Sequence, residues 1–202
     1  MSFCTSIPAQ EEAVRYLNQV ALELPGACIV GGHSKGGNLA VYASSFCQQA
    51  VQTRLVAIYN LDGPGFNSNV LDSPGYARIA NKVKTFIPQS SVVGMLLQYE
   101  EDYMVIQSRQ IGLMQHDLVS WEVDGDQFVY LDEVTGRSKF IDRTLKTWLA
   151  SLSLEEREQF VDTLFAILEE TQATTLRELT ANWQKNAAIV LRSIRELEDE
   201  MR

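Results

Sequence analysis

The sequence predicts an α/β protein in which a mostly parallel sheet is flanked by helices. Three short apolar runs, at residues 27–30, 55–61 and 83–87, are typical of strands buried on both faces. Segments with helical spacing of apolar residues precede the first run, at 9–24, and separate it from the second, at 35–49. Apolar strands that alternate with helices favour parallel pairing, because parallel strands need a crossover connection.

The remaining elements up to residue 135 follow from shorter signals. Pro25-Gly26 ends the first helix, and Pro88 ends the third strand. A short helix is expected at 76–80 and a fourth strand at 103–107. Residues 119–123 and 127–131 flank an Asp-Gly dipeptide and predict a β-hairpin.

The chain after Ser138 is expected to be helical. Ser153 with Glu156, and Thr175 with Glu178, have the spacing of capping boxes. The last segment places apolar residues on one stripe and charged residues on the other. We therefore expect two parts: an α/β core over 1–135 and a C-terminal helical segment over 136–202 that packs on the core or on a partner chain.

Composition narrows the classes of function. The 202 residues carry a formal net charge of -9, which argues against nucleic acid as the main partner and against adsorption to an anionic membrane. Three cysteines without a C-x-x-C pair argue against a disulfide scaffold and a structural zinc site, and fit a reducing compartment. No apolar run is as long as a membrane helix, and the N-terminus lacks a signal-peptide pattern. The expected location is cytoplasmic.

The stretch "GGHSKGGNLAVYA", residues 31–43, contains the pattern G-x-S-x-G around Ser34. This pattern is typical of a nucleophile elbow when it follows a buried strand and opens a helix, as it does here. Glycines at positions 32 and 36 are expected to prevent clashes between side chains and neighbouring backbone. The start of the helix directs free N–H groups, that of Lys35 among them, toward a developing oxyanion.

Two other interpretations of this stretch remain. The Walker and Rossmann phosphate-binding patterns are absent, but an anion cradle at the helix N-terminus is physically feasible. The stretch is also compatible with a tight connection between a strand and a helix that performs no chemistry.

A nucleophilic serine needs a base, and the chain has only two histidines. The side chain of His33 is expected to point away from the neighbouring Ser34 hydroxyl. His116 follows the fourth strand, which fits the chain order serine, acid, histidine of α/β-hydrolases. The sequence therefore predicts His116 as the base.

The acid is left open between several residues. Asp62 ends the second apolar strand, where it could orient the histidine or merely cap the "DGPG" turn. Asp102 and Asp117 are further candidates, although Asp117 adjoins His116 and is expected to point elsewhere. Ser90 or Ser91 is the fallback as a neutral partner of the imidazole.

Four ordered blocks carry a family resemblance: "GGHSKGGNLAVYA", "YNLDGPGF", "FIPQSSVVGMLL" and "QHDLVSWEV". Over residues 7–135 the chain resembles a bacterial lipase-like α/β-hydrolase family, catalogued as a domain of unknown function and similar to class 3 lipases. The resemblance implies a partial α/β-hydrolase fold and matches Ser34 to the nucleophile and His116 to the base. In class 3 lipases the acid follows the strand equivalent to "VKTFI", where this chain has Gln89, Ser90 and Ser91, so that part of the match fails.

The resemblance also implies that several strands should precede the first helix, and this chain lacks them. Met1 is interpreted as a start inside a longer gene or as an artificial boundary. The sheet edge beside the strand at 27–30 would then be exposed, and either another chain, as in a homo-oligomer, or residues 2–8 are expected to cover it. The missing strands would remove one oxyanion donor, worth about 10²–10³ in rate.

These observations favour a serine hydrolase that cleaves a small-molecule ester or lipid. Ser34 attacks, His116 accepts the proton, Asp62 orients the imidazole and the Lys35 N–H holds the oxyanion. No metal or organic cofactor is implied. The alternative is a hydrolase-fold fragment with little or no activity that serves as an interaction or assembly module.

Overall fold

The computed structural model describes residues 8–66, 68–91, 93–94 and 103–132. The helical segment expected at 136–202 lies outside the described residues, as does Asp102.

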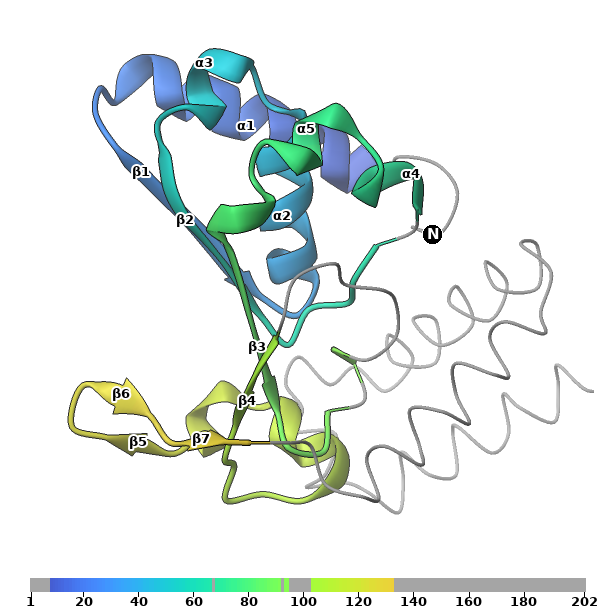
Figure 1. Ribbon diagram of the computed structural model, residues 1–202, viewed down its shortest axis with the longest axis vertical. Coiled ribbons are helices and arrows are strands. Elements are labelled where there is room, and N and C mark those ends of the chain that lie inside the picture. Colours follow the sequence, from blue (N-terminus) through green and yellow to red (C-terminus); the bar gives the residue numbers. More distant parts are fainter. Residues whose placement is uncertain (1–7, 67, 92, 95–102, 133–202) are drawn as a thin grey trace, which may run out of the picture. The chain divides into compact units, whose positions relative to one another are not determined.

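A five-stranded sheet forms the centre of the described chain (Figure 1). Its strand order is β1-β2-β3-β4-β7, and the first four strands are parallel. The last strand joins β4 in antiparallel orientation. The strands are β1 (Cys28–His33), β2 (Leu55–Leu61), β3 (Val83–Pro88), β4 (Tyr103–Ile106) and β7 (Tyr130–Leu131). The predicted α/β class with a mostly parallel sheet is therefore confirmed.

Helices cover one face of the sheet beside β1 and β2 (Figure 1). The core on this face contains Leu17 of α1, Val41 of α2 and Ile58 of β2, and the last two are fully buried. The helices are α1 (Pro8–Glu23), α2 (Lys35–Phe46), α3 (Gln49–Gln52), α4 (Ser68–Leu71) and α5 (Pro74–Ala77), with 3₁₀ turns η1 (Ala80–Lys82), η2 (Gly112–His116) and η3 (Leu118–Ser120).

A second cluster lies on the other face of the sheet. Leu61 and Phe86 are paired across β2 and β3, and both pack in this cluster with Trp121. Side chains three residues apart on a strand point to opposite faces, so Ile58 and Leu61 of the same strand serve different clusters. The segment after His116 therefore packs, through Trp121, on apolar side chains of this face of the sheet.

The predicted hairpin forms, but in a shorter and divided form. Only β5 (Val123–Asp124) and β6 (Gln127–Phe128) pair with each other, across a turn in which Gly125 has φ +63°. Much of the expected first arm lies in or beside the 3₁₀ turn η3. The end of the second arm, β7, instead extends the main sheet beside β4.

Arg54 fixes the entry of the chain into β1. Its guanidinium donates hydrogen bonds to three carbonyl oxygens, those of Ala21 (2.6 Å), Gly26 (2.7 Å) and Leu24. These carbonyls belong to the end of α1 and to the turn that follows it. The planar fork of arginine can serve several acceptors at once, so one side chain just before β2 holds the turn that leads into its neighbour β1.

We predict that Arg54→Lys lowers the free energy of unfolding by about 1–3 kcal/mol, because a single ammonium cannot replace three directed charge-assisted hydrogen bonds. Urea denaturation followed by circular dichroism measures the change. Arg15→Lys is the control, since Arg15 is exposed and, within the described residues, its ion pair is with Glu12 on its own helix. A loss no larger for Arg54→Lys than for the control would contradict this role.

Candidate active site

Ser34 occupies the turn between β1 and α2 in a backbone conformation that side chains rarely adopt, with φ 55° and ψ -126°. Its N–H donates to the carbonyl of Leu61 at the end of β2 (2.9 Å). Its own carbonyl accepts from the N–H groups of Gly37 (3.0 Å) and Asn38 (3.3 Å), which closes the first turn of α2. The turn is therefore held from both sides, and the serine stands at the carboxyl end of a parallel strand.

Glycines allow this turn to pack tightly, although not all at the positions that the sequence predicts. A Cβ at Gly32 would overlap the carbonyl group of Gly36, as expected. A Cβ at Gly36 would meet nothing within 4 Å, so the expected steric role of Gly36 is wrong. Gly37 and Gly63 are the positions that sequence reasoning missed, because a Cβ at either would overlap the side chain of the buried Asn60.

The start of α2 supplies the positive electrostatics of the site. The first N–H groups of an α-helix have no acceptor within the helix, and that of Lys35 follows Ser34 directly. The Lys35 side chain is partly buried, and burial lowers the pKa of its ammonium. The N-terminus of α2 therefore stands directly after the serine, where negative charge is favoured.

Asp62 lies immediately after β2 and is 1% exposed. One carboxylate oxygen, Oδ1, accepts hydrogen bonds from the Ser91 hydroxyl (2.5 Å) and the Gly94 N–H (3.1 Å). The other oxygen, Oδ2, lies 2.6 Å from Nδ1 of His116. A buried carboxylate is stable only when such donors replace water, and all three donors come from segments beyond β3.

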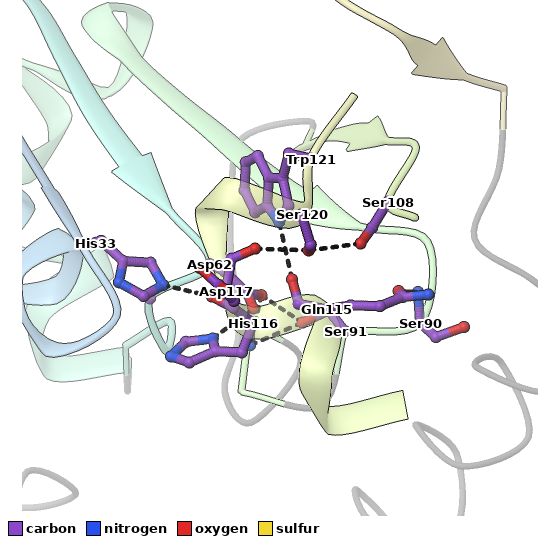
Figure 2. A network of polar contacts seen from close by, with 12 residues as sticks. His33, Asp62, Ser90, Ser91, Ser108, Gln115, His116, Asp117, Ser120 and Trp121 are labelled. Atoms are coloured by element: carbon purple, nitrogen blue, oxygen red, sulfur yellow. Dashed lines mark hydrogen bonds and ion pairs between the residues drawn. The ribbon is translucent and has the colours of Figure 1, made fainter. Parts of the chain in front are cut away.

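His116 is the last residue of η2, and Figure 2 shows its ring directed at Asp62. Because a carboxylate only accepts, Nδ1 of His116 is the donor, and Nε2 of the neutral ring is left free to accept a proton. Of the alternative partners, Ser91 contacts Asp62 instead of the ring, and Asp117 caps η3 by accepting from the Val119 N–H (3.0 Å).

The segment that carries His116 is anchored by its neighbour Gln115, which is 2% exposed. The Gln115 side chain accepts from the Ser90 N–H (2.8 Å) and donates to the Gln110 carbonyl (2.7 Å). The backbone carbonyl of Gln115 accepts from the indole N–H of Trp121 (2.8 Å). Ser90 therefore supports the segment that carries His116 through its backbone N–H.

His33 contacts His116, which the sequence did not predict. Nε2 of His33 lies 2.8 Å from the carbonyl oxygen of His116, and the two ring centroids are 4.4 Å apart with a tilt of 37° (Figure 2). Burial, followed by the charge of His116, lowers the pKa of His33 below its usual 6.5. The one feature of the sequence that hints at this contact is that the chain has only two histidines.

The structure thus joins three predicted residues in one place. Asp62 and His116 are in direct contact, and Ser34 is tied to both, through Leu61 to the strand end at Asp62 and through its chain neighbour His33 to His116. The side chains of Ser34 and His116 are not hydrogen-bonded to each other.

The sequence model of the Mbeg1-like family matches residues 1–166. The chain belongs to this family. A search of curated proteins found no match to it. The match includes Ser34, Asp62 and His116, so the site lies within the part of the chain that defines the family. Within the described residues, no helix is both long and apolar enough to cross a membrane.

We predict opposite effects for two glycine substitutions in the same turn. Gly32→Ala should lower the free energy of unfolding by about 1–3 kcal/mol or more, because its methyl group overlaps the backbone of α2. Gly36→Ala should leave stability unchanged or raise it by up to about 1 kcal/mol, since alanine favours the helix and meets no neighbour. Urea denaturation compares the two, and equal losses would contradict the packing described here.

The lowered pKa of His33 predicts a pH-dependent contribution to stability. As the pH falls below 6.5, the unfolded chain binds a proton at this residue before the folded chain does, so the folded state loses stability. His33→Gln lacks this group. The melting temperature of the wild type should therefore fall more than that of the variant between pH 7.5 and pH 5.5. A difference between the two proteins that stays constant over this range would show that the pKa is not lowered.

Proposed function

We propose that this chain is a serine hydrolase of the lipase or esterase type, with Ser34 as nucleophile, His116 as base and Asp62 as acid. The observation that carries the proposal is the 2.6 Å contact between His116 Nδ1 and the buried Asp62 carboxylate. It sets the tautomer in which Nε2 can accept a proton. The same arrangement of histidine and aspartate orients the base in serine hydrolases on unrelated folds.

The surrounding architecture supports an α/β-hydrolase fold. Ser34 follows a parallel strand and opens a helix, as a nucleophile elbow does. The chain order Ser34, Asp62, His116 is the order of that fold. Ligands of open parallel sheets bind outside the carboxyl ends of the strands, which is where β1 and β2 place Ser34 and Asp62. The Mbeg1-like family is itself lipase-like.

In the first half of the reaction, the Ser34 hydroxyl attacks the ester carbonyl while His116 Nε2 takes its proton. The resulting imidazolium is stabilised by the Asp62 carboxylate across the short contact. The new C–O bond leaves negative charge on the former carbonyl oxygen, and the Lys35 N–H at the start of α2 donates to it. Collapse of this intermediate expels the alcohol, which leaves with the proton from His116.

In the second half, water replaces the alcohol. His116 again takes a proton, this time from water, whose oxygen attacks the acyl carbon. Collapse of the second intermediate releases the carboxylic acid and returns the proton to Ser34. Hydrogen bonds between nucleophile and base are often long in free enzymes and shorten when substrate binds, which accommodates the separation of the Ser34 and His116 side chains.

The proposed substrate is a carboxylic ester, either of a small molecule or of a lipid. The proposed reaction uses no organic cofactor and involves no nucleic acid. The start of α2, which follows Ser34 directly, forms the electropositive side of the site. The competing proposal, an inactive fragment that serves assembly, predicts an unreactive Ser34 and is decided by the same experiment.

We predict that a fluorophosphonate probe labels the wild-type protein and that Ser34→Ala abolishes labelling, because the probe reacts with activated serine hydroxyls. Asp62→Asn should slow labelling by about 10²- to 10⁴-fold, since the amide no longer stabilises the imidazolium. Labelling rates are measured by gel fluorescence over time.

Asp117→Asn is the matched control, because this carboxylate adjoins His116 in the chain but caps η3 and not the imidazole. It should be labelled at nearly the wild-type rate. An unlabelled wild type, under conditions that label a known serine hydrolase, would refute the proposed function. An equal loss in both aspartate variants would refute the role of Asp62.

A further inference from the structure

We propose that His33 is a positioning residue that couples the base His116 to the nucleophile Ser34; this proposal rests on the function proposed above. It assigns a role to the histidine inside the elbow motif, whose side chain the sequence predicts to point away from the serine hydroxyl. It also explains why a second histidine stands against the base.

A hydrogen bond joins the side chain of His33 to the main chain of His116. A carbonyl oxygen can only accept, so Nε2 of His33 carries the hydrogen at this 2.8 Å contact. The bond holds the backbone of His116 at the end of η2. Contacts of Gln115 anchor the preceding residue to Ser90 and Trp121, but neither of these partners belongs to the turn that carries Ser34.

His33 also connects His116 to the turn that carries the nucleophile. His33 is bonded through one peptide link to Ser34, whose N–H is fixed on the Leu61 carbonyl. Among the described contacts of His116, that with His33 reaches the chain neighbour of Ser34 directly, whereas that with Asp62 reaches the serine-bearing turn only through the Leu61 carbonyl. A displacement of about 1 Å between reacting groups can reduce a rate by about 10²-fold, so a direct link between the two segments has catalytic value.

The packing and the charge of the two imidazole rings favour the same role for His33. The His33 ring lies against the His116 ring, with centroids 4.4 Å apart, and limits its rotation about the contact with Asp62. The charged groups that act on His33 are His116 on η2, Asp62 after β2 and Asp117 after η2. Burial and the charge of His116 outweigh the hydrogen bond to the His116 carbonyl and the two carboxylates, so the pKa of His33 is lowered and the ring is neutral at pH 7. His116 therefore becomes an imidazolium beside a neutral ring and not beside a second cation.

The test uses a matched pair of variants in the full-length protein. His33→Gln retains an N–H donor at about the reach of Nε2, whereas His33→Met has a similar length and no donor. With p-nitrophenyl butyrate, His33→Met should lower kcat by about 10- to 100-fold at an unchanged KM, and His33→Gln should restore most of that loss. Melting temperatures establish that both variants are folded.

Two results would overturn the proposal. One is a kcat for His33→Met equal to that of the wild type. The other is an equal loss in both variants, which would assign the effect to packing alone. If the wild type neither cleaves the ester nor reacts with the fluorophosphonate probe, it is the proposed function that fails, and the position of His116 is then judged without turnover.

The position of His116 is measured without substrate by nitrogen NMR of the imidazole rings. The chain has only two histidines, so ¹⁵N-histidine labelling gives the Nδ1 and Nε2 signals of two rings, and each variant retains the signals of one ring. The wild type should show His33 protonated at Nε2 and His116 at Nδ1. The His116 Nδ1–H signal should broaden in His33→Met and stay sharp in His33→Gln. A His33 ring protonated at Nδ1 alone, or a sharp His116 signal in His33→Met, would overturn the proposal whatever the activity.

Discussion

The buried carboxylate of Asp62 is the interaction on which the rest of the site depends. The backbone N–H of Asp62 donates to the carbonyl of Phe86 in β3 (2.8 Å). The Asp62 side chain accepts hydrogen bonds from Ser91, Gly94 and His116. An acceptor at 1% exposure cannot turn to water, so each donor must be brought to it by a folded segment. The charge of one residue thereby arranges the loop after β3 and the turn η2 around the end of β2.

Close approach of the main chain is the second constraint, and it explains which glycines matter. The chain before Ser34 meets α2 at Gly32, and the buried Asn60 fills the space between α2 and the chain after Asp62. Asn60 accepts from the N–H of Gly63 (3.1 Å), and Asn38 ties the same loop to α2 through the carbonyls of Pro64 and Gly65. Two polar core side chains thus hold the serine turn and the aspartate turn at a fixed separation.

The sequence was sufficient for features that depend on local patterns and insufficient for those that depend on distant contacts. The strand at 55–61 and the turn at Ser34 were predicted because apolar runs and glycines identify them directly. Gly37 was missed because its neighbour, the Asn60 side chain, comes from another element. The sequence leaves the pairing of Asp62 with His116 open for the same reason: the loops that carry candidate acids do not encode which one reaches the ring. The sequence excludes His33 as the base only because its side chain is expected to point away from Ser34. Its actual partner, His116, lies 83 residues away in the chain.

Backbone strain adds an argument that is independent of hydrogen bonding. Among the described residues other than glycine, only Ser34 (φ 55°) and Asp62 (φ 48°) have positive φ. Aspartate tolerates the left-handed region better than most residues, but serine at this φ and ψ is unfavourable, by about 1–3 kcal/mol. Such strain persists only where the surrounding structure enforces it, and it concentrates at functional sites. The two strained residues lie at the ends of neighbouring strands, and they are the two that the proposed reaction uses as nucleophile and acid. A tight connection with no chemistry would gain nothing from this conformation, because a glycine at position 34 would form the same turn without the strain.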